Sequence, residues 1–492
     1  MRLRDLVLTL HPDERIPLFR RVARAIQGAI QQGRLAAGQA LPGTRALAEQ
    51  LGVHRATVIQ AIQELEAEGW VITEPSRGTF VATFLHPGST AFATVTPGPN
   101  PAPTSTHTEP GFDLPSRLSP LTKADAALID LSEGLPDASL APAEELGKAY
   151  QRALRRHGEA LLQHGEPMGQ ALLRGQLAEW LSERRGLRLS PEQILITRGS
   201  RAALTLIALS LLREGDSVAV EDPGNRTVWE TFQQSIHVGL ERVPVDAAGM
   251  SVEDLGRVLG QSPCKAVYVT PQWQFPTTAT MSSERRVQLL ELAAEHRIPL
   301  IEDDYDSDFS FGDQSLAALA SLDTRGQVIY TTNLGRLLAP GIRLGCIVGS
   351  TTLIDRLARV QRNLEMQGDR VMEWAAADLI RDGELGRQLR KARKVYEGRM
   401  RFLVSQLQER LGEELEVQIP GGGLALWIRF KEGQMASEWI DAMRIGGLVL
   451  NQPCTYFMDQ PGPYTRMGFA QCSEEVLDLA VDRMRQALQD IS

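Results

Sequence analysis

Residues 302–306 read Glu-Asp-Asp-Tyr-Asp and directly follow the apolar, strand-like run at residues 298–301. A buried carboxylate at the end of a strand can hold a protonated ring nitrogen, and a phenol two residues further on can reach an oxygen on the same ring. The pattern favours Asp303 and Tyr305 as ring-binding residues. The alternative is a solvated acidic loop.

Two other sequences could bind an anion. Gly199 and Ser200 open a helix-like pattern after a strand-like run, and the free N–H groups at a helix N-terminus attract phosphate or carboxylate. The same pair also caps ordinary helices. Arg343, seven residues after Arg336, is a second phosphate candidate, with a structural salt bridge as the alternative.

The elements around these residues alternate between short β-branched runs and amphipathic helices, from residue 193 to the helix that starts near residue 351. This alternation predicts an α/β fold with a mainly parallel sheet covered on both faces. Binding sites in such sheets lie at the carboxyl ends of the strands. All the candidate residues above stand at such ends.

Length and composition describe a protein of two or more domains, with 492 residues, 43% hydrophobic and 23% charged. No apolar run approaches the ~20 residues of a membrane span, and the N-terminus is not a signal peptide. The four cysteines have no Cys-x-x-Cys spacing. We therefore expect neither a zinc site nor a disulfide framework, no membrane partner, and a reducing cytoplasm.

A linker separates the chain into two parts. Residues 87–110 contain six prolines and six threonines, with no helical or strand period. This composition predicts an extended Pro/Thr-rich linker over residues 82–127. The expected domains are residues 1–81 and residues 128–492.

The first part has the pattern of a winged helix–turn–helix. One helical stripe contains Leu18, Val22, Ile26 and Ile30, and Gly52 separates two shorter helices. Two short strands around the turn at residues 75–78 would form a wing. Residues 1–81 carry ten arginines and eight acidic residues, whereas the net charge of the whole chain is −9.

A second helix docked in the major groove would present polar side chains to bases or phosphates, with further contacts from the preceding helix and the wing. The candidate DNA-binding residues are Arg45, His54, Arg55, Thr57, Arg77 and Gly78. The alternative is a set of solvated charges on a small helical domain. Residues 14–82 as a whole resemble the winged helix–turn–helix of the GntR regulators, which implies a double-stranded operator as partner.

Residues 129–492 resemble the fold-type I, aspartate-aminotransferase-like domain. The segments "VEDPG", "TPQWQFPT", "IEDDYDSDF" and "LAPGIRLG" stand in the order found in the MocR/GabR class of GntR regulators. The resemblance implies large and small aminotransferase-like domains, a head-to-tail homodimer, and a pocket for pyridoxal phosphate.

The resemblance also implies a role for each matching residue. Asp303 would hold the pyridine nitrogen and Tyr305 would contact the ring hydroxyl. Ser200 and Arg343 would bind the phosphate. Arg466, in "YTRMGFA", would bind a ligand carboxylate.

The departures from the family change the expected chemistry. Where the family reads Gly-Thr-Phe-Ser-Lys, residues 332–336 read Thr-Asn-Leu-Gly-Arg, so Arg336 replaces the Schiff-base lysine. Asn225 and His164 stand where the family has aromatic residues, and Thr278 where it has glycine. A Schiff base needs a neutral amine. Arginine's pKa exceeds 12, so its neutral fraction at pH 7 is about one in 10⁵ or less.

Two interpretations of the pocket follow. Arg336, Arg343 and Arg466 could bind a small anionic effector without covalent bonds, including pyridoxal phosphate itself. Alternatively, Arg336 could pair with Asp303 or Asp304 and fill the cofactor space. We therefore expect a catalytically inactive, dimeric DNA-binding transcription regulator. The alternatives are an aminotransferase with a DNA-binding head and a ligand-independent repressor.

Overall fold

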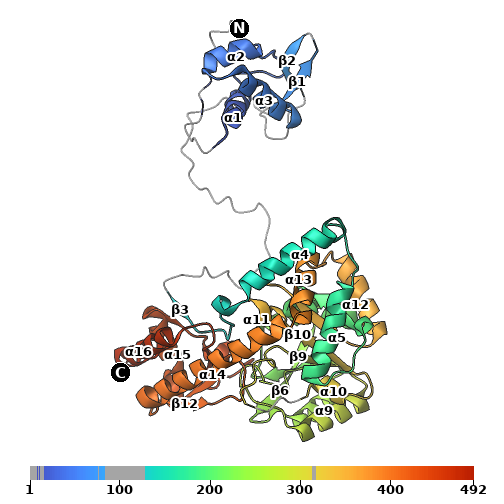
Figure 1. The fold of residues 1–492 in the computed structure, drawn as a ribbon. Coiled ribbons are helices and arrows are strands. Elements are labelled where there is room, and N and C mark those ends of the chain that lie inside the picture. Colours follow the sequence, from blue (N-terminus) through green and yellow to red (C-terminus); the bar gives the residue numbers. More distant parts are fainter. Residues whose placement is uncertain are drawn as a thin grey trace. The chain divides into compact units, whose positions relative to one another are not determined.

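The computed structural model describes residues 16–75, 77–83, 128–312 and 317–491, together with Leu8 and Leu10. It divides into two compact units, Met1–Pro120 and Leu121–Ser492, called here the head and the body (Figure 1). From residue 84 on, the predicted linker lies outside the described residues.

The head contains three helices and a two-stranded antiparallel sheet. Its elements are α1 (Leu18–Gln31), α2 (Thr44–Leu51), α3 (Arg55–Ala67), β1 (Val71–Glu74) and β2 (Gly78–Val81). Val22, Ile26 and Ile30 are buried, as predicted for one stripe of α1. Leu18, at the N-terminal end of the same stripe, is 41% exposed because it is the first residue of α1.

The body is built on an eight-stranded sheet whose strands are parallel except for β11 and β7. In spatial order the strands are β4 (Ile194–Thr197), β11 (Gly345–Val348), β10 (Val328–Thr332), β9 (Leu300–Asp304), β8 (Cys264–Val269), β5 (Ser217–Asp222), β6 (Gly239–Asp246) and β7 (Gly249–Met250).

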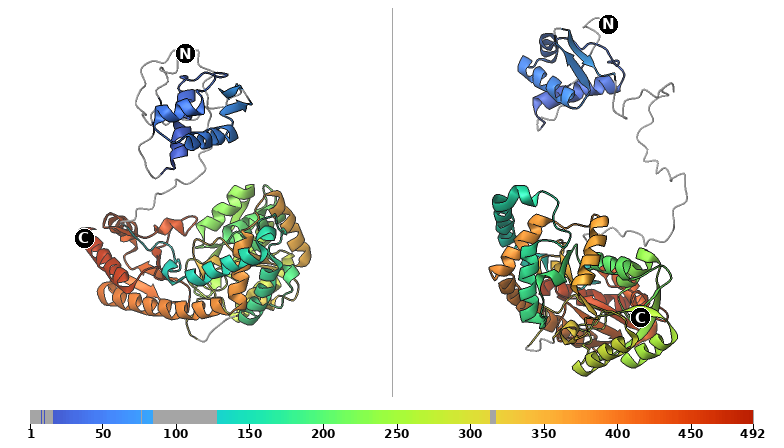
Figure 2. Two further views of the ribbon diagram at one scale, coloured as in Figure 1. Left: turned by 45° about the horizontal axis from the view of Figure 1, so that its top comes forward. Right: turned by 90° about the vertical axis from the view of Figure 1, so that its right-hand side faces the viewer.

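Helices cover both faces of this sheet, as the two views in Figure 2 show. On one face, Leu204, Phe232 and Leu357 pack on strand residues such as Ile301; the helices are α6 (Ser200–Leu211), α7 (Arg226–Ile236) and α12 (Thr351–Asn363). The other face is covered by α5 (Ala171–Arg185), α8 (Val252–Gln261) and α9 (Ser283–His296). Burial on both faces explains the continuous apolar strands.

The body also contains a three-stranded antiparallel sheet. Its strands are β12 (Leu415–Gln418), β13 (Ala425–Phe430) and β15 (Tyr464–Gly468). In a separate two-stranded sheet, β3 (Ile129–Asp130) pairs in parallel with β14 (Leu448–Val449). The remaining α-helices are α4 (Ala143–Leu161), α10 (Leu319–Leu322), α11 (Gly335–Leu338), α13 (Arg370–Arg381), α14 (Glu384–Leu411), α15 (Ala436–Ile445) and α16 (Glu474–Ile491). No helix among the described residues is both long and apolar enough to span a membrane.

Candidate functional site

A cavity of about 260 Å³ lies in the body where the sequence predicted a pocket. All six predicted pocket residues line it: Ser200, Asp303, Tyr305, Arg336, Arg343 and Arg466. They come from segments more than 260 residues apart in the chain. The alternation of side chains along β9 decides which acidic residue enters the cavity, because successive residues point to opposite faces of a sheet.

Asp303 is on the face of β9 that α6 covers. Its carboxylate accepts hydrogen bonds from the Tyr268 hydroxyl (2.8 Å) and the Thr331 hydroxyl (3.3 Å). Burial raises the pKa of Asp303 to about 6. The carboxyl is therefore oriented by two hydroxyl donors and able to change protonation near neutral pH.

Asp304 faces the opposite side of the sheet. Its carboxylate accepts hydrogen bonds from Arg185 Nε (2.7 Å) and from the Tyr330 hydroxyl (2.6 Å). It takes no part in the cavity. The ion pair with Arg185 is buried, and its role is structural.

Arg336 pairs with Asp306. Its Nε donates to Asp306 Oδ1 at 2.6 Å, and one terminal nitrogen donates to the backbone carbonyl of Gly134. The predicted pairing with Asp303 or Asp304 was wrong. Asp303 and Asp304 are held by hydroxyl and guanidinium donors on their own strand faces, whereas Asp306 lies just past β9, on the same side as Arg336.

Asp306 also lies 4.0 Å from Arg466, which is 2% exposed. Burial raises the pKa of the Asp306 carboxyl, and the Coulombic attraction of the two arginines opposes that shift. Arg466 further donates to the carbonyl of Pro276 (3.2 Å) and lies over the ring of Phe275. One carboxylate thus serves two arginines, and this end of the cavity is already ion-paired.

The other end of the cavity contains two arginines that form no direct ion pair with a described residue, although the nearby Glu133 carboxyl attracts Arg201. Helix α6 starts at Ser200, after Gly199 at φ 88°, and a Cβ on Gly199 would lie 3.8 Å from Arg343 Nε. Arg201 and Arg343 both line the cavity, and within the described parts of the chain neither forms an ion pair. The free N–H groups at the start of α6 add to this positive potential.

Tyr305 lies between the two ends. Its hydroxyl donates to the carbonyl of Trp273 at 2.6 Å, and its ring faces the Arg336 guanidinium at 5.6 Å. The phenol proton is therefore engaged by the protein backbone rather than directed at the cavity.

In the head, the predicted DNA-binding residues lie on α2, α3 and the wing. Arg45, His54, Arg55, Arg77 and Gly78 are exposed and Thr57 is half-buried. His54 is the N-cap of α3, where its Nδ1 accepts from the Ala56 N–H at 3.3 Å. This bond places the ring proton on Nε2, and directs His54 to a capping role in addition to any contact with DNA.

Arg55 and Arg77 already have intramolecular partners. Arg55 Nε donates to the hydroxyl of Thr44, the first residue of α2, at 3.1 Å. In the wing, Arg77 pairs with Glu74 at 2.5 Å, with both side chains largely exposed. An exposed pair of this kind contributes little stability, so Arg77 can leave Glu74 for a phosphate at small cost.

Two known protein families match this chain, one over the head and one over the body. The family of bacterial regulatory proteins named gntR matches residues 18–81, and the family of class I and II aminotransferases matches residues 126–484. The probable rhizopine catabolism regulatory protein MocR of Rhizobium meliloti is 30% identical over 483 residues, which cover 98% of this chain and 96% of the relative. The chain belongs to the MocR-type regulators of the GntR family.

Other relatives of this MocR-type regulator resemble either the whole chain or most of it. The uncharacterized HTH-type transcriptional regulator YdeL of Bacillus subtilis is 26% identical and covers 96% of the chain. The solved structure of LysN, an α-aminoadipate aminotransferase of Thermus thermophilus, has a TM-score of 0.69 at 25% identity and covers 74% of this chain and 93% of its own. The predicted fold, a winged helix–turn–helix with a fold-type I body, is confirmed. The protein is a transcription regulator with a GntR DNA-binding domain and an aminotransferase-like domain.

The cavity of this MocR-type regulator fits part of the cofactor that its fold family carries. Ser200, Arg343 and the start of α6 suit a phosphate, and the oriented carboxyl of Asp303 suits a ring nitrogen. The covalent link does not fit, because no lysine lines the described cavity and the Arg336 guanidinium is bonded to Asp306. We therefore derive no covalent step at this site.

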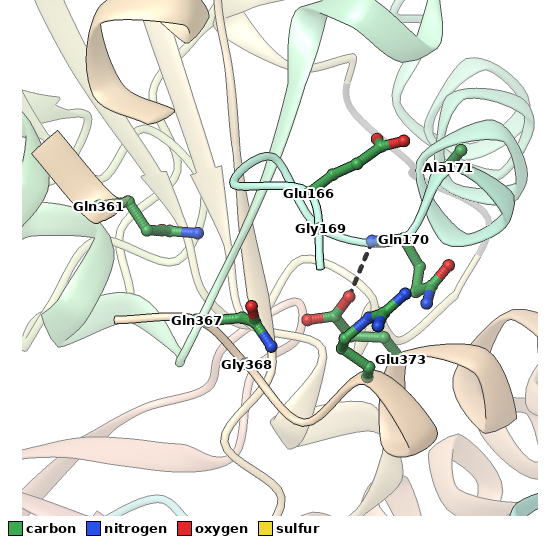
Figure 3. Close-up of a pocket in the computed structure, with 9 residues that line it drawn as sticks. Glu166, Gly169, Gln170, Ala171, Gln361, Gln367, Gly368 and Glu373 are labelled. Atoms are coloured by element: carbon green, nitrogen blue, oxygen red, sulfur yellow. Dashed lines mark hydrogen bonds between the residues drawn. The ribbon is translucent and has the colours of Figure 1, made fainter. Parts of the chain in front are cut away.

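A second, smaller cavity of about 70 Å³ lies between the segment before α5 and the start of α13 (Figure 3). Glu373 accepts the backbone N–H of Gln170 there at 2.8 Å. The side-chain oxygen of Gln361 is buried without a hydrogen-bond partner among the described residues. A polar cavity of this size suits ordered water.

The predicted site residues did not include Arg201, which lines the main cavity, or Asp306, which pairs with the lining residues Arg336 and Arg466. Asp306 was part of the quoted acidic cluster, and Arg201 follows Ser200 at the start of α6. Their positions relative to Asp303 and Ser200 could have indicated both: an acid three residues after Asp303, just past the strand, and a cation in the first turn of a helix.

Proposed function

We propose that the aminotransferase-like body of this transcription regulator binds a small anion noncovalently and that binding changes how the head engages operator DNA. The observation that carries the proposal is the contrast between the two ends of the cavity. Arg336 and Arg466 share the carboxylate of Asp306, whereas Arg343 and Arg201 form no direct ion pair within the described chain, and only Arg201 is attracted by the nearby Glu133. Guanidinium groups without a direct ion pair, beside a helix N-terminus, favour a phosphate or carboxylate.

The ligand class includes pyridoxal phosphate held without a covalent bond. Catalysis by transamination is not proposed, because the guanidinium of Arg336 stays protonated and cannot act as the amine of a Schiff base. We place the protein in the cytoplasm, where a DNA-binding regulator and its metabolite would meet.

The path from the cavity toward the head begins at Gly134. Arg336 donates to the carbonyl of Gly134, and residues 133 and 134 line the cavity. The same segment follows β3, where the chain enters the body. A ligand that changes the bonding of Arg336 would therefore act on the segment that continues into the linker.

The body is also proposed to form the head-to-tail homodimer that presents two heads. Support comes from apolar side chains left on its surface, with Leu162 at the C-cap of α4 76% exposed and Leu154 within α4 37% exposed. We expect sedimentation of the full chain to give a dimer.

The anion proposal is tested by calorimetric titration of pyridoxal phosphate, inorganic phosphate and uncharged pyridoxal into the full-length protein. We expect the two phosphate ligands to bind and Arg343→Gln to weaken them about tenfold, the loss of one charge-assisted contact. The matched control is Arg359→Gln, on the surface of α12 and outside the cavity. No binding by the wild type would favour the ligand-independent repressor instead.

A further inference from the structure

The exposed face of α3 has fewer charged residues than is usual for the solvent-exposed face of a helix. The buried face consists of Val58, Ala61, Ile62 and Leu65. The opposite face exposes Arg55, Ala56, Ile59, Gln60 and Gln63. It therefore carries one cation, two apolar side chains and two amides, and no acidic group in its first two turns.

The first two turns of α3 are the part that a helix–turn–helix inserts into the major groove. The helix begins at Arg55, directly after the His54 cap. Arg55, Ala56, Ile59 and Gln60 belong to these turns, and Gln63 lies one turn further along. Side chains other than Arg55 are therefore also placed where they could contact base edges.

Arg55 is positioned for a two-nitrogen contact. Its Nε is used by the Thr44 hydroxyl, at 3.1 Å. This bond holds the side chain against the start of α2 and leaves the two terminal nitrogens without a hydrogen bond to the described residues. A fork of two N–H donors matches the O6 and N7 acceptors of guanine.

Gln60 carries the complementary chemistry for adenine. Its side chain is exposed, and within the described chain its amide forms no hydrogen bond. An amide offers one donor and one acceptor in a plane, which matches N7 and N6 of adenine. Arginine cannot accept a hydrogen bond, so Gln60 and Arg55 would select different bases.

Ile59 adds an apolar contact beside Gln60. It is 39% exposed, an unusual position for a large apolar side chain. An apolar group in the major groove contacts the methyl group of thymine. The five-residue separation of Arg55 and Gln60 spans about 7.5 Å along the helix, or about two base-pair steps.

We propose that Gln60 and Ile59 are specificity-determining residues of this regulator. Each operator half-site then contains an A·T pair about two base pairs from the guanine read by Arg55, with adenine recognised by Gln60 and the thymine methyl group by Ile59. The proposal concerns the head alone and stands whether or not the body binds an anion.

The test is a selection of double-stranded DNA from a random library by the full-length protein. The variants are Gln60→Glu, Gln60→Ala and Ile59→Ala. We expect Gln60→Glu to exchange adenine for cytosine at one position of each half-site, because a carboxylate accepts from cytosine N4. The exchange should be about tenfold or more, the discrimination of a bidentate contact.

The matched control is Gln63→Glu, which adds the same negative charge one turn away. It should lower affinity for all sequences without changing the selected base. If Gln60→Glu binds too weakly for selection, Gln60→Ala should still bind and lose its preference for adenine. A preference at that position unchanged in Gln60→Ala, or a wild-type half-site with no A·T pair near the guanine, would overturn the proposal.

Discussion

At the scale of single residues, Arg336 sets what the cavity can do. A guanidinium is a permanent cation with five donors, and here two of its nitrogens are occupied by Asp306 and by the Gly134 carbonyl. A guanidinium cannot supply the neutral amine of a Schiff base, whereas its positive charge attracts anions. The same substitution makes Asp306 the counter-ion of a buried cluster.

Removing the charge of Asp306 should destabilise the body. Asp306→Asn leaves Arg336 and Arg466 without their shared carboxylate, and breaking a buried ion pair costs about 3–5 kcal/mol. Denaturant unfolding of the body measures the change. The control is Glu230→Gln on the surface pair with Arg226, which should change stability by about 0.5 kcal/mol or less. A loss below about 1 kcal/mol in Asp306→Asn would contradict a structural ion pair.

A second residue-scale prediction concerns pH. Glu221 is buried at the end of β5, where Thr270 donates to it, and burial raises its pKa from 4.5 to about 7. Its favourable contribution is complete below pH 4.5 and is lost as the pH rises through about 7, because the folded protein must then bury a carboxylate.

We therefore expect the unfolding free energy of the wild type to fall between about pH 5 and about pH 8. Glu221→Gln should fall less over this interval, since its amide stays neutral. Denaturant titrations at several pH values measure both slopes, with Glu230→Gln as the control that keeps the wild-type slope. Identical slopes in Glu221→Gln and wild type would show that Glu221 does not cause the loss.

The sequence located the cavity residues well and their pairing poorly. Asp303, Tyr305 and Arg343 stand at the ends of recognisable strands, and parallel strands bring such ends together. Which acid pairs with Arg336 depends on distances between segments that are about thirty residues apart. The preference for Asp306 over Asp303 comes from Tyr268 and Thr331, which already donate to Asp303. The spacing of residues in the sequence could not predict that these hydroxyl groups occupy Asp303.

At the scale of elements, the start of α3 depends on an unusual cap. His54 Nδ1 accepts from the Ala56 N–H, whereas serine, threonine or aspartate more often caps a helix. The helix thus begins at Arg55, with Arg55 and Gln60 in its first two turns. The cap couples the stability of α3 to the geometry of its base-reading face.

Replacing the cap should loosen the first turn of α3. His54→Ala removes an acceptor for the Ala56 N–H, at a cost of about 1 kcal/mol. Hydrogen exchange at Ala56 should then be about fivefold faster. His54→Asn retains a capping oxygen and should keep the wild-type rate. Equal exchange in all three proteins would mean that the cap does not hold the turn.

The element boundaries show where sequence patterns suffice. The wing strands and the end of α2 at Gly52 were predicted from glycine and from alternation, and Gly52 has φ 64° as a left-handed cap requires. The exposure of Leu18 could not be predicted, because periodicity identifies a helical face and gives no information on where the core ends. The edge of the core is determined by how the helices and strands of the head pack together.

At the scale of the whole molecule, two different functions share one chain. The head is a GntR DNA-binding domain, and the body is a large aminotransferase-like α/β frame, for which we propose noncovalent binding of an anion. The charge is divided in the same way, with a slightly basic first 81 residues in a chain whose net charge is −9. Electrostatic attraction to DNA is therefore confined to the head.

The most direct test of this account measures the unfolding temperature and the absorption spectrum of the full-length protein with saturating pyridoxal phosphate. A ligand at about 100 times its Kd adds about 2.7 kcal/mol to the domain that binds it. We predict a higher unfolding temperature of the body, with the spectrum of the free ligand and no imine band, and an imine band in Arg336→Lys. An imine band in the wild type would contradict the loss of covalent chemistry. An unchanged unfolding temperature would contradict binding of this ligand.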